Sequence, residues 1–277
     1  MYAGTLLRIP IVQHVHVSPT EAYEQSLLAS GRIIAVSEFV RQQVLRFNIS
    51  KDIVHVVHNG LDCSYYRPAR FSREKIRKEL EIPLNAKVVL VVARLHPQKR
   101  HDLVLKVASQ LKSTLPSLRL IFNGESFGQT GYEDSIRERA RALRLADRVK
   151  WIPFVPDVRP LYSAADTLVL CSDQEAFPRC VTEAMAMQLP VVVTDSGGQV
   201  EVVKNGETGL VVRAGHVSDL ARCILEVLTD ESLCVRMTKA ARDYVAINLS
   251  LEGQVDAITR IYEQLLASKI TAGHLDA

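Results

Sequence analysis

Two short segments of the sequence hold charged residues whose types and spacing suit an anionic ligand that carries hydroxyl groups. In the first, Arg94 and Lys99 share a loop that follows an apolar run. An arginine fork and a lysine point charge can together clamp a diphosphate. In the second, Glu175 and Glu183 form a Glu-x7-Glu pair, and carboxylates accept hydrogen bonds from sugar hydroxyls. On residue type alone, each pair is more simply explained as solvated surface charge.

The residues between the two glutamates predict the start of a helix. Pro178 suits the first turn of a helix. The backbone N–H groups of Arg179, Cys180 and Val181 would then lack intrahelical partners and form an anion site. Glu183 lies about one turn further along, so its carboxylate can face the same pocket.

The elements that must position these residues are short apolar runs alternating with amphipathic segments. The predicted strands are Ile11–Val17, Ile33–Val36, Val54–Val57, Val88–Ala93, Leu118–Phe122, Val149–Ile152, Thr167–Leu170, Val191–Thr194 and Leu210–Val212. The predicted helices include Asp102–Lys112, Tyr132–Leu145, Asp219–Leu228 and Leu251–Ala267, and Ser37 and Ser218 stand where helix N-caps belong. Such alternation predicts an α/β fold with parallel sheets and right-handed crossovers. The turn at Asn59-Gly60-Leu61-Asp62 marks a boundary after about three strands, fewer than the usual sheet holds.

Composition narrows the class of protein. The 277 residues are 47% hydrophobic and carry a net charge of +3 without a block of like charges, so a sizeable core is expected and a nucleic-acid partner is not. No apolar run reaches the roughly 18 residues of a membrane-spanning helix, and the first residues lack the pattern of a signal peptide. The five cysteines are scattered without a Cys-x-x-Cys pair, which fits a reducing cytoplasm.

Several common catalytic patterns are absent from the sequence. It contains no Gly-x-x-x-x-Gly-Lys-Ser/Thr, Gly-x-Gly-x-x-Gly, His-Glu-x-x-His or Gly-x-Ser-x-Gly. This argues against a P-loop NTPase, a standard dinucleotide enzyme, a zinc hydrolase and an α/β-hydrolase. Neither the cysteines nor the histidines have the spacing of a metal site.

The sequence around the two glutamates resembles the sequences of one large enzyme family. EAFPRCVTEAMA is similar to the donor loop of the retaining glycosyltransferases of family 4, also called glycosyl transferases group 1, and ARLHPQKRHDL is similar to their arginine–lysine element. IIAVSEFV, VVHNGLD, FVPDVRPLYSAAD, LPVVVTDSGGQVEVVKNGETGLVV and a closing helix follow the same family order. The resemblance runs from about Pro10 to Leu266 and implies the GT-B fold. It implies that residues 1–69 are the last part of the acceptor-side Rossmann-like domain, 70–250 the Rossmann-like donor domain, and 251–277 a helix that crosses back.

The resemblance also implies roles for individual residues. Arg94 and Lys99 would hold the donor diphosphate and stabilise the charge of the departing nucleotide. Glu183 would bind the ribose hydroxyls, and Glu175 would orient the donor sugar. His16 would be the active-site histidine near the sugar, with His14 as its competitor.

Backbone groups complete the implied donor site. Phe177, Pro178, Arg179, Cys180 and Val181 would orient the sugar and its phosphate through their backbone. The backbone around Phe154 and Val155 would meet the nucleobase. Gly124 would let the chain approach the nucleotide closely. Ala93 and Arg100 depart from the family, which often has glycine at both positions.

The implied activity is transfer of a hexosyl group from a nucleotide-diphosphate sugar to a sugar or lipid acceptor with retention. No cofactor and no metal are expected, because cations and a helix N-terminus would neutralise the diphosphate. Two alternatives stay open: a truncated or non-catalytic nucleotide-sugar-binding module that needs a partner chain, and a sugar-nucleotide epimerase of the same fold, which the Glu-x7-Glu loop disfavours. A cytoplasmic location is expected, with contact at the membrane surface as an alternative.

Overall fold

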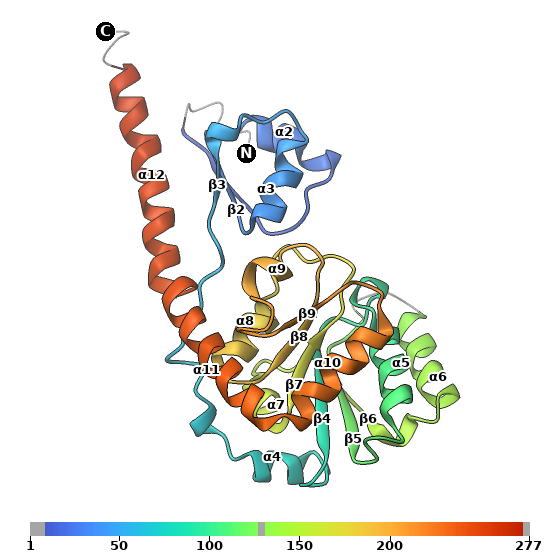
Figure 1. Ribbon diagram of the computed structural model, residues 1–277. Helices are drawn as coiled ribbons and strands as arrows, with labels where there is room; N and C mark the ends of the chain where they lie inside the picture. The colour runs from blue at the N-terminus through green and yellow to red at the C-terminus, as the bar shows by residue number, and fades with distance from the viewer. Residues whose placement is uncertain (1–8, 127–130, 274–277) are drawn as a thin grey trace. The chain divides into compact units, whose positions relative to one another are not determined.

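The computed structural model describes residues 9–126 and 131–273, which divide into two units (Figure 1). The smaller unit holds the described chain up to Leu61, the segment Glu175–Phe177 and the chain from Asn248 onwards. The larger unit holds Asp62–Gln174 and Pro178–Ile247. The division after Leu61 lies inside the turn that the sequence marks as a boundary, and residues 62–69 group with the larger unit.

The smaller unit is built on a parallel sheet of three strands in the order β1-β2-β3. The strands are β1 (Val12–Val15), β2 (Arg32–Ala35) and β3 (Val54–Val56), and the helical segments are η1 (Glu21–Tyr23), α2 (Glu24–Leu28), α3 (Glu38–Leu45), η2 (Lys51–Ile53) and α12 (Leu251–Gly273). The Ser37 hydroxyl accepts a 3.1 Å hydrogen bond from the Val40 N–H, which confirms Ser37 as the N-cap of α3. Helix α12 packs on the sheet, where Ile261 contacts Ile34 and Val57.

The larger unit is built on a parallel sheet of six strands in the order β6-β5-β4-β7-β8-β9. The strands are β4 (Lys87–Val92), β5 (Leu118–Asn123), β6 (Val149–Ile152), β7 (Thr167–Leu170), β8 (Val191–Thr194) and β9 (Leu210–Val212). Every residue of β7 and β8 is buried, which is why these strands read as continuous apolar runs rather than as an alternation. The chain runs outward from β4 on one side and then from β7 on the other, so a topological switch point lies between these two strands.

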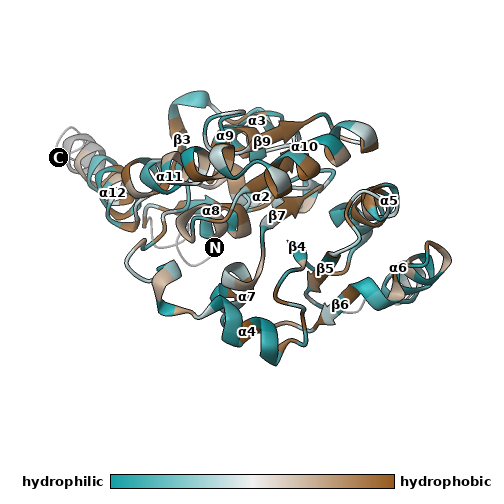
Figure 2. Cartoon of the chain, turned by 60° about the horizontal axis from the view of Figure 1, so that its bottom comes forward, coloured by the Kyte–Doolittle hydropathy of each residue, from teal (hydrophilic) through white to brown (hydrophobic). Residues whose placement is uncertain are grey.

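Helices cover both faces of the larger sheet. The helical segments of this unit are η3 (Pro68–Arg70), α4 (Arg73–Glu79), η4 (Pro97–Lys99), α5 (His101–Leu111), α6 (Tyr132–Ala142), η5 (Ala146–Arg148), α7 (Arg159–Ala164), α8 (Arg179–Ala186), α9 (Gln199–Val202), α10 (Val217–Thr229) and α11 (Glu231–Asn248). Figure 2 shows β7 and β9 as strongly hydrophobic, whereas α4 is largely hydrophilic.

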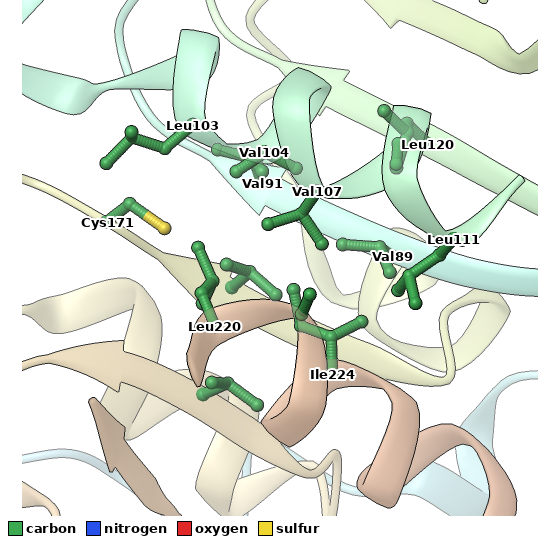
Figure 3. Close-up of a cluster of buried hydrophobic side chains, with 14 of the residues drawn as sticks. Val89, Val91, Leu103, Val104, Val107, Leu111, Leu120, Cys171, Leu220 and Ile224 are labelled. Carbon is green, nitrogen blue, oxygen red and sulfur yellow. The ribbon is translucent and has the colours of Figure 1, made fainter. Parts of the chain in front are cut away.

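The main core lies where α5 and α10 meet the sheet (Figure 3). Val104 and Val107 of α5 and Leu220 and Ile224 of α10 lie in one cluster with Val89 and Val91 of β4, and all six side chains are buried. The spacing of three or four residues places each helical pair on one face. Burial of each such side chain contributes roughly 1.5–3 kcal/mol to folding.

The structure confirms the predicted α/β class and all nine predicted strands, although β1 is shorter than the predicted Ile11–Val17. The prediction for Ser218 is wrong. Helix α10 begins at Val217 after His216, so Ser218 lies inside its first turn. Gly215 has a positive φ of 80°, and the His216 N–H bonds the Arg213 carbonyl. Because of this turn, the helix begins before the position that an N-cap at Ser218 would give it.

One charged side chain is buried beside the sheet. Arg77 of α4 is 2% exposed. Its guanidinium donates hydrogen bonds of 2.8–2.9 Å to the carbonyls of Ala164, Leu84 and Ala86. A further bond of 2.8 Å joins it to the Asp166 carboxylate. Arg77 therefore ties α4 to the chain before β4 and before β7.

Candidate functional site

A cavity of about 490 Å³ opens in the larger unit at the carboxyl ends of β4 and β5. Its lining includes Arg94 after β4, Gly124 after β5, and Cys180 and Glu183 of α8. Open α/β sheets bind ligands outside the carboxyl ends of their strands, at the switch point. Ligand sites commonly measure roughly 300–1,000 Å³, so the cavity has the size and the place of a small-molecule site.

Arg94 is a cation of the cavity lining that is available for a ligand. Its side chain is exposed, and within the described chain no hydrogen bond or ion pair engages its guanidinium. By contrast, Arg159 on the cavity wall is bound to Asp157 by a 2.7 Å ion pair. Lys99 ends η4 on the loop that Arg94 begins, outside the cavity lining.

The glycine at the end of β5 is required by the backbone. Gly124 has a φ of +142°, and a Cβ built there would overlap the carbonyl oxygen of Ala93. The close approach at Gly124 is therefore between the ends of two neighbouring strands, a reason that the sequence does not reveal. The preceding Asn123 is buried, and its side-chain amide donates 2.7 Å to the Pro153 carbonyl. This bond holds the start of the loop whose Val155 lines the cavity.

The carboxylate of Glu183 is held by two tyrosines that sequence reasoning missed. The Tyr162 hydroxyl donates a 2.8 Å hydrogen bond to Glu183 Oε2, and Tyr66 bonds the same carboxylate. Arg179 Nη2 lies 3.8 Å from Glu183 Oε1. Burial raises the pKa of Glu183, while its hydrogen bonds and Arg179 oppose the rise. The group is thus a rigid acceptor at the cavity wall.

The N-terminus of α8 differs in one respect from the sequence prediction. Helix α8 begins at Arg179 with Pro178 as its N-cap, and Cys180 lines the cavity. However, the Val181 N–H donates a 3.0 Å bond to the Pro178 carbonyl. The prediction that Val181 offers a free N–H to an anion is therefore wrong, because the first turn tightens and uses that donor itself.

The remaining predicted site residues lie in the smaller unit. Glu175 and Phe177 belong to its short central segment, and the Phe177 ring lies 5.6 Å from the His58 ring. The rings of His14 and His16 stack at 6.3 Å, and His14 Nε2 is 3.3 Å from the Tyr262 hydroxyl. Burial, and then the charge of His16, lower the pKa of His14. Catalytic roles for Glu175 and His16 stay predictions.

A second cavity, of about 640 Å³, lies at the amino ends of the larger sheet. Lys87, which begins β4, and Asp166, which precedes β7, are among its lining residues. The arginine of this wall is engaged: Arg73 forms an ion pair with Asp166 and donates a hydrogen bond of 2.6 Å to the Ala165 carbonyl. The larger cavity is therefore at the end of the sheet opposite to Arg94 and offers less to an anionic ligand.

His101, which begins α5 next to the Lys99 loop, gives the larger unit a predictable response to pH. The side chain is fully buried against Phe122 and Tyr132. Burial, and then the charge of Lys99, lower the pKa of His101 to about 4. Unfolding returns this pKa to its ordinary value, so the unfolded state binds the proton more tightly. We expect the free energy of unfolding to fall by about 2 kcal/mol between pH 7 and pH 5 from this group.

Denaturant unfolding at several pH values measures this effect. The variant His101→Gln should show a flatter pH dependence than the wild type over that window. His216→Gln, at an exposed position in the same unit, should keep the wild-type slope. Equal slopes for wild type and His101→Gln would contradict the assignment.

Neither a spanning helix nor a metal cluster occurs in the described ranges. No helix there is long and apolar enough to cross a membrane. Likewise, no three His, Cys, Asp or Glu side chains there are grouped so that they could hold a metal ion.

Known proteins share this arrangement. A solved glycosyltransferase from Rickettsia africae matches with a TM-score of 0.84 and 25% identity over 92% of this chain and 70% of that chain. Anabaena Alr3699/HepE, solved in complex with UDP and glucose, matches with a TM-score of 0.86 and 24% identity over 94% of this chain and 73% of that chain. Two parallel α/β units with a cavity at the switch point of the larger one define the class as the GT-B glycosyltransferase fold.

Sequence comparison gives the family. The model of the family described as "Glycosyl transferases group 1" matches residues 72–244, and that described as "Glycosyltransferase Family 4" matches residues 1–65. The chain belongs to the glycosyl transferases of group 1. Among curated relatives, the D-inositol 3-phosphate glycosyltransferase of Corynebacterium aurimucosum is 29% identical over 91% of this chain. The chain spans 61% of the length of that relative.

Proposed function

We propose that the larger unit binds a nucleotide-diphosphate sugar and that the protein transfers the hexosyl group to a sugar or lipid acceptor with retention. The observation that carries the proposal is the cavity at the switch point, which places Arg94, without a partner among the described residues, in the same lining as the Glu183 carboxylate, whose side chain is 14% exposed. A cation and a fixed acceptor are what a diphosphate and a ribose require of a protein.

Each residue of the proposed donor site has one task. Arg94 binds the diphosphate and stabilises the charge that develops as the nucleotide departs, and Lys99 supports it from the same loop. Glu183 accepts hydrogen bonds from the ribose hydroxyls. The backbone at Val155 meets the nucleobase. No metal is required in this scheme, because the cations neutralise the diphosphate.

The sugar and the acceptor are assigned to the rest of the donor loop and to the smaller unit. Glu175 and the backbone from Phe177 to Val181 orient the sugar, with the Val181 N–H excluded as a donor. His16, with His14 as the alternative, acts near the sugar. The five free cysteines support a cytoplasmic location.

Calorimetric titration of the chain with UDP, GDP and ADP sugars tests the proposal. UDP-glucose is the first probe, because Anabaena Alr3699/HepE is solved with UDP and glucose. Saturable binding of one nucleotide class, lost in the Arg94→Ala/Glu183→Ala double variant, supports the donor site. A folded wild-type chain that binds none of these donors would overturn it.

Turnover separates transfer from binding. Release of nucleotide in the presence of an acceptor panel, with the anomeric configuration of the product read by NMR, tests transfer and retention. Inositol phosphates belong in this panel because of the name of the Corynebacterium relative. Binding without transfer to any acceptor would favour the alternative, a nucleotide-sugar-binding module that needs a partner chain.

Glu183→Gln tests the ribose assignment. The amide keeps the volume of the side chain and an oxygen that can accept from Tyr162, but it loses the charge and one acceptor. We expect the Kd for UDP to rise about tenfold, because hydrogen bonds to a charged group contribute about 1.5–3 kcal/mol. The Kd for inorganic pyrophosphate, which has no ribose, should stay the same.

The exposed Glu226 of α10 provides the matched control, since Glu226→Gln changes the same chemistry away from the cavity. If Glu183→Gln weakens UDP and pyrophosphate equally, the carboxylate acts on the fold of the site rather than on the ribose.

A further inference from the structure

Arg100 has an unusual backbone for its place in the chain. It joins η4 to α5 with φ 52° and ψ 43°, the left-handed region. Glu81, Arg144 and Gln188 also have positive φ, but each follows the C-terminal end of a helix, where a left-handed residue commonly closes the last turn. Arg100 also closes a helical turn, that of η4, where its N–H bonds the Pro97 carbonyl, but unlike the other three residues it leads directly into a second helix, α5. A side chain at this position costs the fold energy that glycine would not.

The side chain of Arg100 uses this position to bind two loops. Its Nε donates 3.0 Å to Asp102 Oδ1 at the start of α5. Its Nη1 donates a hydrogen bond of 2.8 Å to Oδ1 of Asp173, a residue that lies beyond the end of β7. Both carboxylates help to hold the guanidinium charged, and the side chain is 30% exposed. A fork with several donors can hold two carboxylates at once, which a lysine cannot do with fixed geometry.

Two further bonds join the same loops. The Asp173 N–H donates 2.8 Å to the Gln98 carbonyl, and the Gln98 side chain donates 3.0 Å to the Gln174 carbonyl. One loop carries Lys99 next to Gln98. The other continues directly into Glu175. The bonds therefore couple the cation loop to the stretch of chain that leads into the Glu-x7-Glu segment.

We propose that Arg100 is a positioning residue for donor binding, which holds the loop of Lys99 against the loop that ends at Gln174. It acts through Asp173 and does not itself touch the donor. This inference rests on the proposed function. A positioning role explains why a strained arginine stands where glycine would adopt the backbone without strain.

The test compares Arg100→Gly with Arg144→Gly. Both replace an arginine of positive φ with the residue that adopts this backbone freely, but Arg144 is exposed and follows the end of α6. We expect Arg100→Gly to raise the Kd for the donor that the wild type binds about fivefold, as for a half-exposed ion pair whose neighbouring bonds remain. Asp173→Asn should give a similar rise, and the double variant should add little. Arg144→Gly should leave the Kd unchanged.

A second readout keeps the inference separate from the proposed function. Hydrogen exchange reports the amide of Asp173 without any ligand, and we expect faster exchange around it in Arg100→Gly but not in Arg144→Gly. Wild-type binding together with an unchanged Kd in Arg100→Gly would overturn the positioning role. Faster exchange in a protein that binds no nucleotide sugar would overturn the proposed function and leave only the coupling of the loops. Unchanged exchange would overturn that coupling.

Discussion

Replacement of Arg94 by alanine is expected to raise the Kd for the nucleotide-diphosphate sugar about 100-fold. Two charge-assisted hydrogen bonds of about 1.5 kcal/mol each give a loss of this size. The wild-type guanidinium is exposed at the cavity, and no described residue competes for it. Removing it therefore breaks no internal ion pair in the described chain, and the fold should persist. Calorimetric titration and thermal unfolding measure the two quantities.

Two further variants show whether the loss of affinity comes from the guanidinium of Arg94. Arg94→Lys keeps the charge but loses the fork, so its Kd should fall between those of the wild type and Arg94→Ala. Arg141→Ala removes an exposed arginine from α6, outside the cavity lining, and should bind as the wild type does. A Kd for Arg94→Ala within threefold of the wild type would be too small a loss for a residue that clamps the diphosphate.

Replacement of Arg77 by methionine is expected to lower the free energy of unfolding by about 3–5 kcal/mol, because buried acceptors that lose their donor cost roughly 1–3 kcal/mol each. Methionine fills much of the volume but leaves three carbonyls without their donor. Asp166 would remain paired with Arg73, which donates a hydrogen bond to its other carboxylate oxygen. Denaturant unfolding followed by circular dichroism measures the change.

The neighbouring Lys78 supplies the control on the same helix. Its side chain is 66% exposed and pairs only at the surface with Glu74, so Lys78→Met should change stability by less than about 1 kcal/mol. Similar losses for the two variants would show that α4 is not held by its buried arginine.

The sequence predicted the strands of this fold well because each is a short apolar run buried on both faces or nearly so, as in β7 and β8. The family resemblance also pointed to Arg94 and Glu183, and the structure places both in the lining of one cavity. The tyrosines that hold Glu183 could not be found in the same way. Tyr66 and Tyr162 come from distant parts of the chain, and nothing in their local spacing points to a shared partner.

The sequence also did not show which backbone groups pair with each other at the start of a helix. A serine near the start of α10 resembles an N-cap, but the turn at Gly215 starts the helix before it. At α8, the tight first turn consumes the Val181 N–H that an ideal helix would leave free. The local sequence shows which donors and acceptors are present. Which of them form hydrogen bonds depends on the folded backbone.

The smaller unit is assembled from widely separated parts of the chain, and this affects the order in which the protein can fold. Its three strands end at Val56, but α12, which covers Ile34 and Val57, comes almost 200 residues later. The Leu61 N–H bonds the Leu249 carbonyl, and the Gly60 N–H bonds the Gln254 side chain, across the same separation. The larger unit makes its sheet contacts within itself. During synthesis on the ribosome, β1, β2 and β3 emerge before α12 and must therefore wait for that helix before their core is closed, whereas the unit encoded between them can fold first.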